Sequence, residues 1–139
     1  MVIGGSGRVV VVRLSEGADV EAQIKEAMKS SSVDAALIIG IGSFSYSKIG
    51  WFDTGSGSYK ETEIDQLAEV APMVGNYVLS NGKPFLHIHV NLGTRDRSWS
   101  GHLLAARVGI NLEVFATEIS GVPLARSKDK KFGLEMLDA

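Results

Sequence analysis

The Asn-Gly pair at residues 81–82 is the feature that most constrains what this chain can fold into. Both residues accept the positive φ of a type I′ turn, whose twist matches that of two paired strands. β-rich runs stand on either side, MVGNYVLS before the pair and KPFLHIHVNL after it. The sequence therefore predicts a β-hairpin over residues 73–92 with an antiparallel sheet built around it.

Further strands are expected on both sides of this hairpin. Residues 8–14 and 35–41 are continuous apolar runs of the kind found in buried strands, and residues 44–52 alternate as a half-exposed strand does. The glycines at 40 and 42 favour a bend between the last two segments. After a polar turn at residues 93–98, we expect two more strands, SWSGHLLAAR and INLEVFATEI, separated by a turn at Val108-Gly109.

One segment carries clear helical spacing. Asp19 is a good N-cap residue, and apolar side chains follow at Val20, Ile24 and Met28, so a helix is expected from Asp19 to about residue 30. Residues 60–71 also carry apolar side chains at helical spacing, but Pro72 disfavours a helical Ala71, so helix and strand both stay open there. One helix beside many antiparallel strands predicts an α+β fold.

Composition limits the classes of protein to which the chain can belong. Its 139 residues are 45% hydrophobic and 22% charged, which suits a single globular domain over residues 1–139. There is no cysteine, which excludes disulfides, zinc-thiolate sites and thiol catalysis. We expect a cytoplasmic protein with no membrane segment, because no apolar run reaches the roughly 18 residues of a spanning helix and the N-terminus does not resemble a signal peptide. The net charge of −2 lacks the basic surplus typical of a duplex-binding domain.

All three histidines fall in one short stretch, at His87, His89 and His102. In FLHIHVNL the strand alternation places His87 and His89 on one face and the apolar residues on the other. If the following turn is centred between Arg95 and Asp96, His89 lies directly opposite His102 and His87 lies diagonal to it. Opposed Cβ atoms are about 4.5–5.5 Å apart and diagonal ones about 7–8 Å, so three imidazoles can converge on one ion.

Three neutral imidazoles suit zinc or another late first-row divalent metal and leave a coordination position open. Water, a substrate or a group from a neighbouring subunit could fill that position. A turn at Val108-Gly109 would bring Glu113 onto the same face, diagonal to His102, as a candidate general base. The alternative is that the histidines are ordinary polar surface. The basic run from Arg126 to Lys131 is expected to be a solvated tail, although apolar residues after it favour packing of the C-terminal segment.

The motifs GIGSF, GNYVLSNGKPFLHIHVNLG, GHLL and EVF together resemble the plants-and-prokaryotes conserved (PPC) domain over nearly the whole chain. The resemblance implies a strongly bent antiparallel sheet with one main helix, assembled as a homotrimer, and a zinc site at the positions of His87, His89 and His102. It also matches Glu69 and Glu113 to acidic positions of the family. Members of this kind are associated with DNA binding, but the chain has no AT-hook segment, which weakens the case for autonomous DNA binding.

Three functions therefore stay open. The first is a trimeric, metal-carrying binding module with a DNA, protein or small-molecule partner. The second is a metal-dependent hydrolase or lyase that uses the open position on the three-histidine site, with Glu113 or Glu69 as general base. The third is an oligomerisation domain whose histidines bind nothing. The acidic pI of about 5.9 favours a protein or a small ligand over duplex DNA as the partner.

Overall fold

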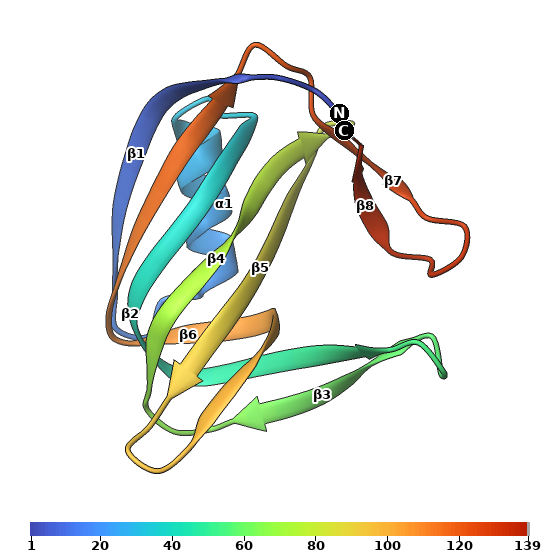
Figure 1. Ribbon diagram of the computed structural model, residues 1–139. Helices are drawn as coiled ribbons and strands as arrows, with labels where there is room; N and C mark the ends of the chain where they lie inside the picture. The colour runs from blue at the N-terminus through green and yellow to red at the C-terminus, as the bar shows by residue number, and fades with distance from the viewer. Residues whose placement is uncertain (139) are drawn as a thin grey trace.

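The computed structural model describes residues 1–138, which form one helix and two antiparallel sheets. Its elements follow the chain in this order: β1 (Gly5–Ser15), α1 (Val20–Ser30), β2 (Ala35–Asp53), β3 (Ser58–Ile64), β4 (Ala68–Ser80), β5 (Lys83–Gly93), β6 (Ser98–Ser120), β7 (Ala125–Lys128) and β8 (Glu135–Asp138). The larger sheet has six strands in the order β1-β6-β5-β4-β2-β3, with an additional β6–β2 pairing. The expected α+β fold with a bent antiparallel sheet is confirmed (Figure 1).

Two long strands, β2 and β6, give the sheet its bend. The first half of β2 pairs with β4 and with the second half of β6, and the second half of β2 pairs with β3 and with the first half of β6. Both strands turn sharply between their halves, so one part of the sheet stands across the other (Figure 1). Gly42 allows this bend, because it has φ +148° and an added Cβ would lie 2.2 Å from the Asn111 carbonyl oxygen.

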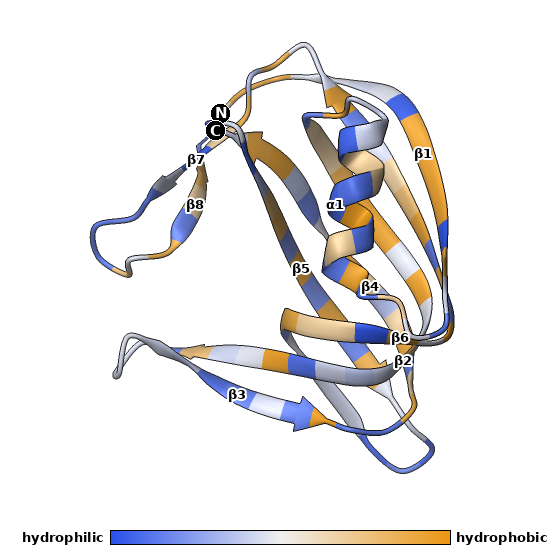
Figure 2. Ribbon diagram, turned by 180° about the vertical axis from the view of Figure 1, so that it is seen from behind, coloured by the Kyte–Doolittle hydropathy of each residue, from blue (hydrophilic) through white to orange (hydrophobic). Residues whose placement is uncertain are grey.

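The helix α1 covers one face of the sheet and forms the core with it. Asp19 accepts a hydrogen bond from the Ala22 N–H at 2.9 Å, which caps the helix as expected. Val20, Ile24 and Met28 are buried against the sheet. Figure 2 views the molecule from this side and shows hydrophobic and hydrophilic residues alternating along α1 and the strands behind it. At 11 residues, α1 is too short to cross a membrane, and no other helix occurs in residues 1–138.

The opposite face of the sheet, which we call the outer face, also carries apolar side chains, and these are exposed. Cross-strand pairing aligns Val11, Phe115, Ile39 and Val74 in one row. Their relative exposures of 43–63% mean that no described residue of the chain covers them. The row continues from Val74 to His89 on β5, so the apolar surface runs directly into the histidine region.

Two sequence expectations about the strands are wrong. The first strand is not buried, because β1 lies at the edge of the sheet and turns Val9 and Val11 to the outer face. There is no turn at Val108-Gly109, since β6 runs unbroken from Ser98 to Ser120 and the glycine instead provides room at the bend. An added Cβ at Gly109 would lie 2.5 Å from a Leu67 methyl group.

The open choice over residues 60–71 is resolved in favour of strands, since these residues lie in β3, a short connection and the start of β4. The pattern misleads there because Ile64 and Ala68 are buried from two different strands, whereas Leu67, on the same helical stripe, is 52% exposed.

The C-terminal segment folds back onto the sheet as expected, although Phe132, Met136 and Leu137 stay 36–40% exposed, and its first basic residue is not a solvated one. The strands β7 and β8 form a two-stranded hairpin beside the ends of β4 and β5 (Figure 1). The Arg126 N–H donates a 2.9 Å hydrogen bond to Ser80 Oγ at the end of β4. The Arg126 side chain is only 6% exposed, because the hairpin folds it back onto the sheet.

Candidate metal centre

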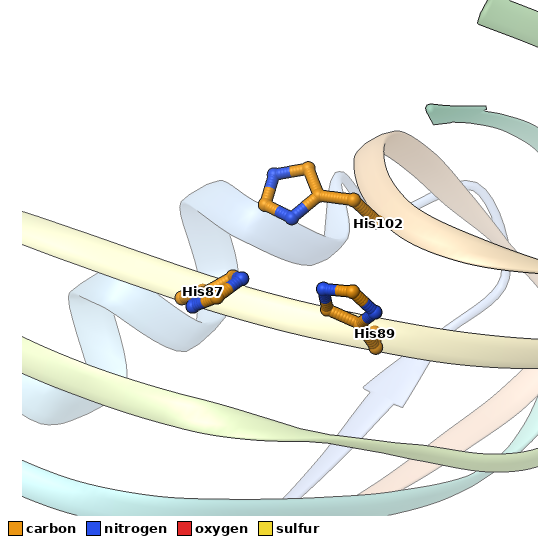
Figure 3. Close-up of side chains that lie close together, drawn as sticks. All are labelled: His87, His89 and His102. Atoms are coloured by element: carbon orange, nitrogen blue, oxygen red, sulfur yellow. The ribbon is translucent and has the colours of Figure 1, made fainter. Parts of the chain in front are cut away.

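The three histidines lie together on the outer face, where β5 meets the first half of β6. His87 and His89 come from alternate positions of β5, and the expected pairing of His89 with His102 is confirmed. Their ring centroids are 5.0–5.5 Å apart. One potential ligand nitrogen from each ring lies within 4.8 Å of those of the other two. Figure 3 shows the three rings turned toward a common space, with His102 above and His87 and His89 below.

The neighbours of His102 hold its ring in place. Tyr59 stacks on it from β3, with ring centroids 5.2 Å apart and an interplanar angle of 26°. Its Nδ1 atom is buried and has no hydrogen-bond partner among the described residues. A buried ring nitrogen without a partner costs free energy, which a metal ion at that position would recover.

Burial keeps two of the imidazoles in their ligating form. Burial, followed by the charges of His102, Arg126 and His89, lowers the pKa of His87 to about 4. The pKa of His102 is also lowered, mainly by burial and then by His89 and Arg126, with Glu21 opposing the shift. Neutral imidazole is the form that binds metal, so both rings are ready to bind an ion at neutral pH.

A cleft of about 410 Å³ opens beside this group. His89 and His102 form part of its wall, together with Asn91 and the aromatic residues Trp51 and Tyr59. A metal held by the three histidines would therefore present its open coordination position to solvent or to a small ligand.

The two candidate general bases do not join the histidines within one subunit. Glu113 lies in the second half of β6, and β4 and β2 stand between that segment and β5. At about 4.8 Å per strand spacing, this separation is roughly 14 Å. Glu69 pairs with Gly93, four residues along β5 from His89. The expectation that Glu113 lies diagonal to His102 is thus wrong, because it depended on the turn that β6 lacks.

Three further residues beside the site were not identified from the sequence. Tyr59 reaches His102 only because β3 folds back along β2. Asn76 pairs with His87 across the β4–β5 hairpin, a position that the hairpin register could have given. Arg126 is far along the chain, yet it donates a 2.6 Å hydrogen bond from Nη2 to Asn76 Oδ1.

Comparison with known proteins supports this picture. A family model described as the Plants and Prokaryotes Conserved (PCC) domain matches residues 1–120. A metal-containing protein from Archaeoglobus fulgidus is 32% identical, with a TM-score of 0.91 over 99% of this chain and 97% of that one. A plant- and prokaryote-conserved protein from Pyrococcus horikoshii is also 32% identical, with a TM-score of 0.92 over 100% of this chain and 98% of that one.

A more distant structure shares the fold. It is a Bacteroides thetaiotaomicron protein with a provisional DNA-binding assignment, 21% identical, with a TM-score of 0.86 over 97% of this chain and 96% of that one. No curated protein sequence is significantly similar to the chain.

Proposed function

The chain belongs to the Plants and Prokaryotes Conserved (PCC) domain family, and on that premise we propose that it is a zinc-binding homotrimer that acts by binding a partner. The convergence of His87, His89 and His102 carries the metal part of this proposal. The buried, unpartnered Nδ1 of His102 supports it from the side of energetics. That a 32% identical relative is a metal-containing protein supports it independently.

Zinc fits the donor set. Zinc sites use three or four protein ligands, with imidazole nitrogens about 2.0–2.1 Å from the ion. The three rings would therefore have to move slightly closer together to bind it. The ion would supply a Lewis-acidic position that faces the cleft. Tyr59 would hold the His102 ring, and the β5–β6 pairing would hold His89.

The exposed outer face supports assembly of several copies. Its row of Val11, Phe115, Ile39 and Val74 is too apolar and continuous to stay in water. A second copy of the chain is the natural cover for a β-sheet face of this kind, and closed cyclic assembly hides the same patch on every subunit. We therefore assign this face to the subunit interface of the trimer.

The partner is a protein or a small ligand rather than duplex DNA. The chain carries a net charge of −2, and non-specific duplex binding needs a surplus of positive charge that displaces counterions. The provisional DNA-binding assignment of the relative that is 21% identical therefore does not extend to this chain in our proposal.

Metal content and mass test the proposal directly. The chain is purified without a polyhistidine tag, and zinc per subunit is measured by elemental mass spectrometry beside His89→Ala and the control Asn91→Ala, two residues along the same strand face. We expect near-stoichiometric zinc in the wild type and in the control, and loss of zinc in His89→Ala. No zinc in the wild type, even after equilibration with the ion, would refute the metal site. Light scattering that gives a monomer would refute the trimer.

DNA binding is tested separately by gel shift. We expect random duplex DNA to bind this protein no more tightly than it binds an acidic control protein. Tight binding at physiological salt would refute the assignment of a non-DNA partner.

The cleft beside His89 and His102 favours one second candidate, a metal-dependent hydrolase or lyase. Zinc lowers the pKa of bound water to about 7, and the cleft could admit a small substrate. Glu113 or Glu69 could then act as general base only from a neighbouring copy. Turnover by the zinc-loaded protein on a panel of esters, phosphoesters and lactones, lost in His89→Ala, would favour this candidate.

A further inference from the structure

Arg126 carries a buried positive charge that the described chain does not neutralise. Arg126 as a whole is 6% exposed, and the charge of Glu135 acts on its guanidinium only from beyond ion-pair distance. Buried charges are ordinarily paired, because removing a charge from water is costly. Within residues 1–138, Arg126 therefore has no carboxylate partner at ion-pair distance.

The hydrogen bonds of this guanidinium are also incomplete. Nη1 donates to the Glu135 carbonyl oxygen at 2.8 Å, and Nη2 donates to Asn76 Oδ1 at 2.6 Å. Both acceptors are neutral. The Nε atom is buried and has no partner among the described residues. The guanidinium is thus held firmly in place while some of its donors stay free.

The position of Arg126 relates it to the candidate metal centre. Its Cζ atom lies 4.2 Å from the ring centre of Phe85, and Phe85 and His87 are consecutive residues on the outer face of β5. Asn76, the acceptor for Nη2, is the cross-strand partner of His87. Residues two apart on a strand are about 7 Å apart, so the guanidinium is one side-chain position away from the histidines.

A cavity gives a ligand access to this charge. It has a volume of about 290 Å³ and is lined by Arg126, Phe85, Lys83, Ser80, Asn81 and Glu135. Lys83 adds a second cation suited to oxyanions, whereas the Ser80 hydroxyl already donates to the Arg126 carbonyl oxygen. Glu135 is the one carboxylate in the lining, and it does not form an ion pair with the guanidinium.

We propose that this cavity binds the oxyanion group, carboxylate or phosphate, of a small molecule whose other end reaches a metal held by the three histidines. A planar guanidinium with free donors matches both kinds of oxyanion. The inference rests on the proposed metal site for the second contact, but the anion site is built from Arg126, Asn76 and Lys83 alone. With a bound divalent ion, the neighbourhood gains further positive charge and so favours an anion more strongly.

The test places a negative charge next to Arg126 by a substitution in the chain itself. Asn76→Asp places a carboxylate on the guanidinium through the existing contact, which preserves the structural role of Arg126 and removes its need for an external anion. Gln23→Glu is the control, because it adds the same charge at an exposed position of α1, on the opposite face of the sheet from the histidines. Arg126→Lys keeps the charge but removes the planar fork. Zinc content is measured first in every variant.

Isothermal titration calorimetry with malonate and with inorganic phosphate then gives the affinities, and the two probes show which oxyanion the site prefers. We expect measurable binding to the wild type, a loss of tenfold or more in Asn76→Asp and Arg126→Lys, and a change of less than threefold in Gln23→Glu. Equal affinities in all four zinc-loaded proteins would overturn the proposal and leave Arg126 a structural residue. Absence of anion binding in the wild type, with a lower assembly mass in Arg126→Lys, would also overturn it, because Arg126 would then meet a second copy.

The failure of the metal site is distinguishable from this outcome. If the wild type holds no zinc, the same titrations on the metal-free protein still compare Asn76→Asp with Gln23→Glu. A selective loss in Asn76→Asp would support the anion site without the metal.

Discussion

At Gly75 the strands β4 and β5 approach too closely for any side chain, so replacing this glycine should disturb the candidate metal centre. Gly75 faces Ile88 across the β4–β5 hairpin. A Cβ added there would lie 1.9 Å from the His87 carbonyl oxygen and 2.7 Å from the Ile88 Cα. Both are backbone atoms, so no rotamer change relieves the contact, and β5 would have to move away by roughly 1 Å.

The size of the effect follows from this displacement. Overpacking of this kind costs about 1–3 kcal/mol, and each weakened cross-strand hydrogen bond adds about 1 kcal/mol. We therefore expect Gly75→Ala to lower the free energy of unfolding by about 2–5 kcal/mol. Metal–ligand distances tolerate only about 0.2 Å, so a shift of the His87 backbone should also remove zinc from the protein.

Urea denaturation at one fixed protein concentration, with zinc per subunit measured in parallel, checks this expectation. Gly93→Ala is the control, because it lies at the end of β5 and an added Cβ there meets nothing within 4 Å. It should leave stability and zinc content close to those of the wild type. A Gly75→Ala protein with an unchanged urea midpoint and full zinc would refute the steric argument.

Three other perturbations have defined outcomes. Hydrogen bonds from Arg8 lower the pKa of Glu118 to about 2. The stability that this carboxylate adds is therefore present above pH about 4.5 and lost as the pH falls toward 2. In Glu118→Gln, the urea midpoint should change less with pH across that range than it does in the wild type. Removing zinc with a chelator should lower the Tm of the wild type and leave that of His89→Ala unchanged, as differential scanning calorimetry would show. Asp19→Ala removes the cap on the Ala22 N–H and should cost about 1 kcal/mol in urea titrations, whereas Asp19→Asn should cost much less.

The parts of the fold set by local chemistry were predictable from the sequence. The Asn81-Gly82 turn fixes the β4–β5 hairpin, and alternation along β5 assigns His87 and His89 to the outer face. The short polar turn at residues 93–98 then fixes the register that places His102 opposite His89. Each of these inferences spans only a few residues, where turn geometry and side-chain period leave little freedom.

The parts set by distant contacts were not predictable. Val108-Gly109 resembles a turn locally, yet β6 continues through it because β2 pairs with both of its halves. Val9 and Val11 have the composition of a buried strand, but they lie on the outer face, where inner-strand residues such as Ile39 are exposed as well. Arg126 gives no local sign of burial, because its partner Asn76 is 50 residues away.

The continuous pairing of β2 has a consequence for how the protein opens. From Ala36 to Gly42 it pairs with β4 on one edge and β6 on the other, and from Ser47 to Gly50 with β3 and β6. Its amides should therefore exchange with deuterium only when the whole subunit unfolds, whereas β1 and β3 exchange through local fraying. β6 carries His102 and pairs with β2 along both of its halves. The candidate ligand His102 therefore lies on the part of the molecule whose amides should exchange most slowly. Release of a bound ion would then proceed through side-chain motion in the cleft rather than through local unfolding of the sheet.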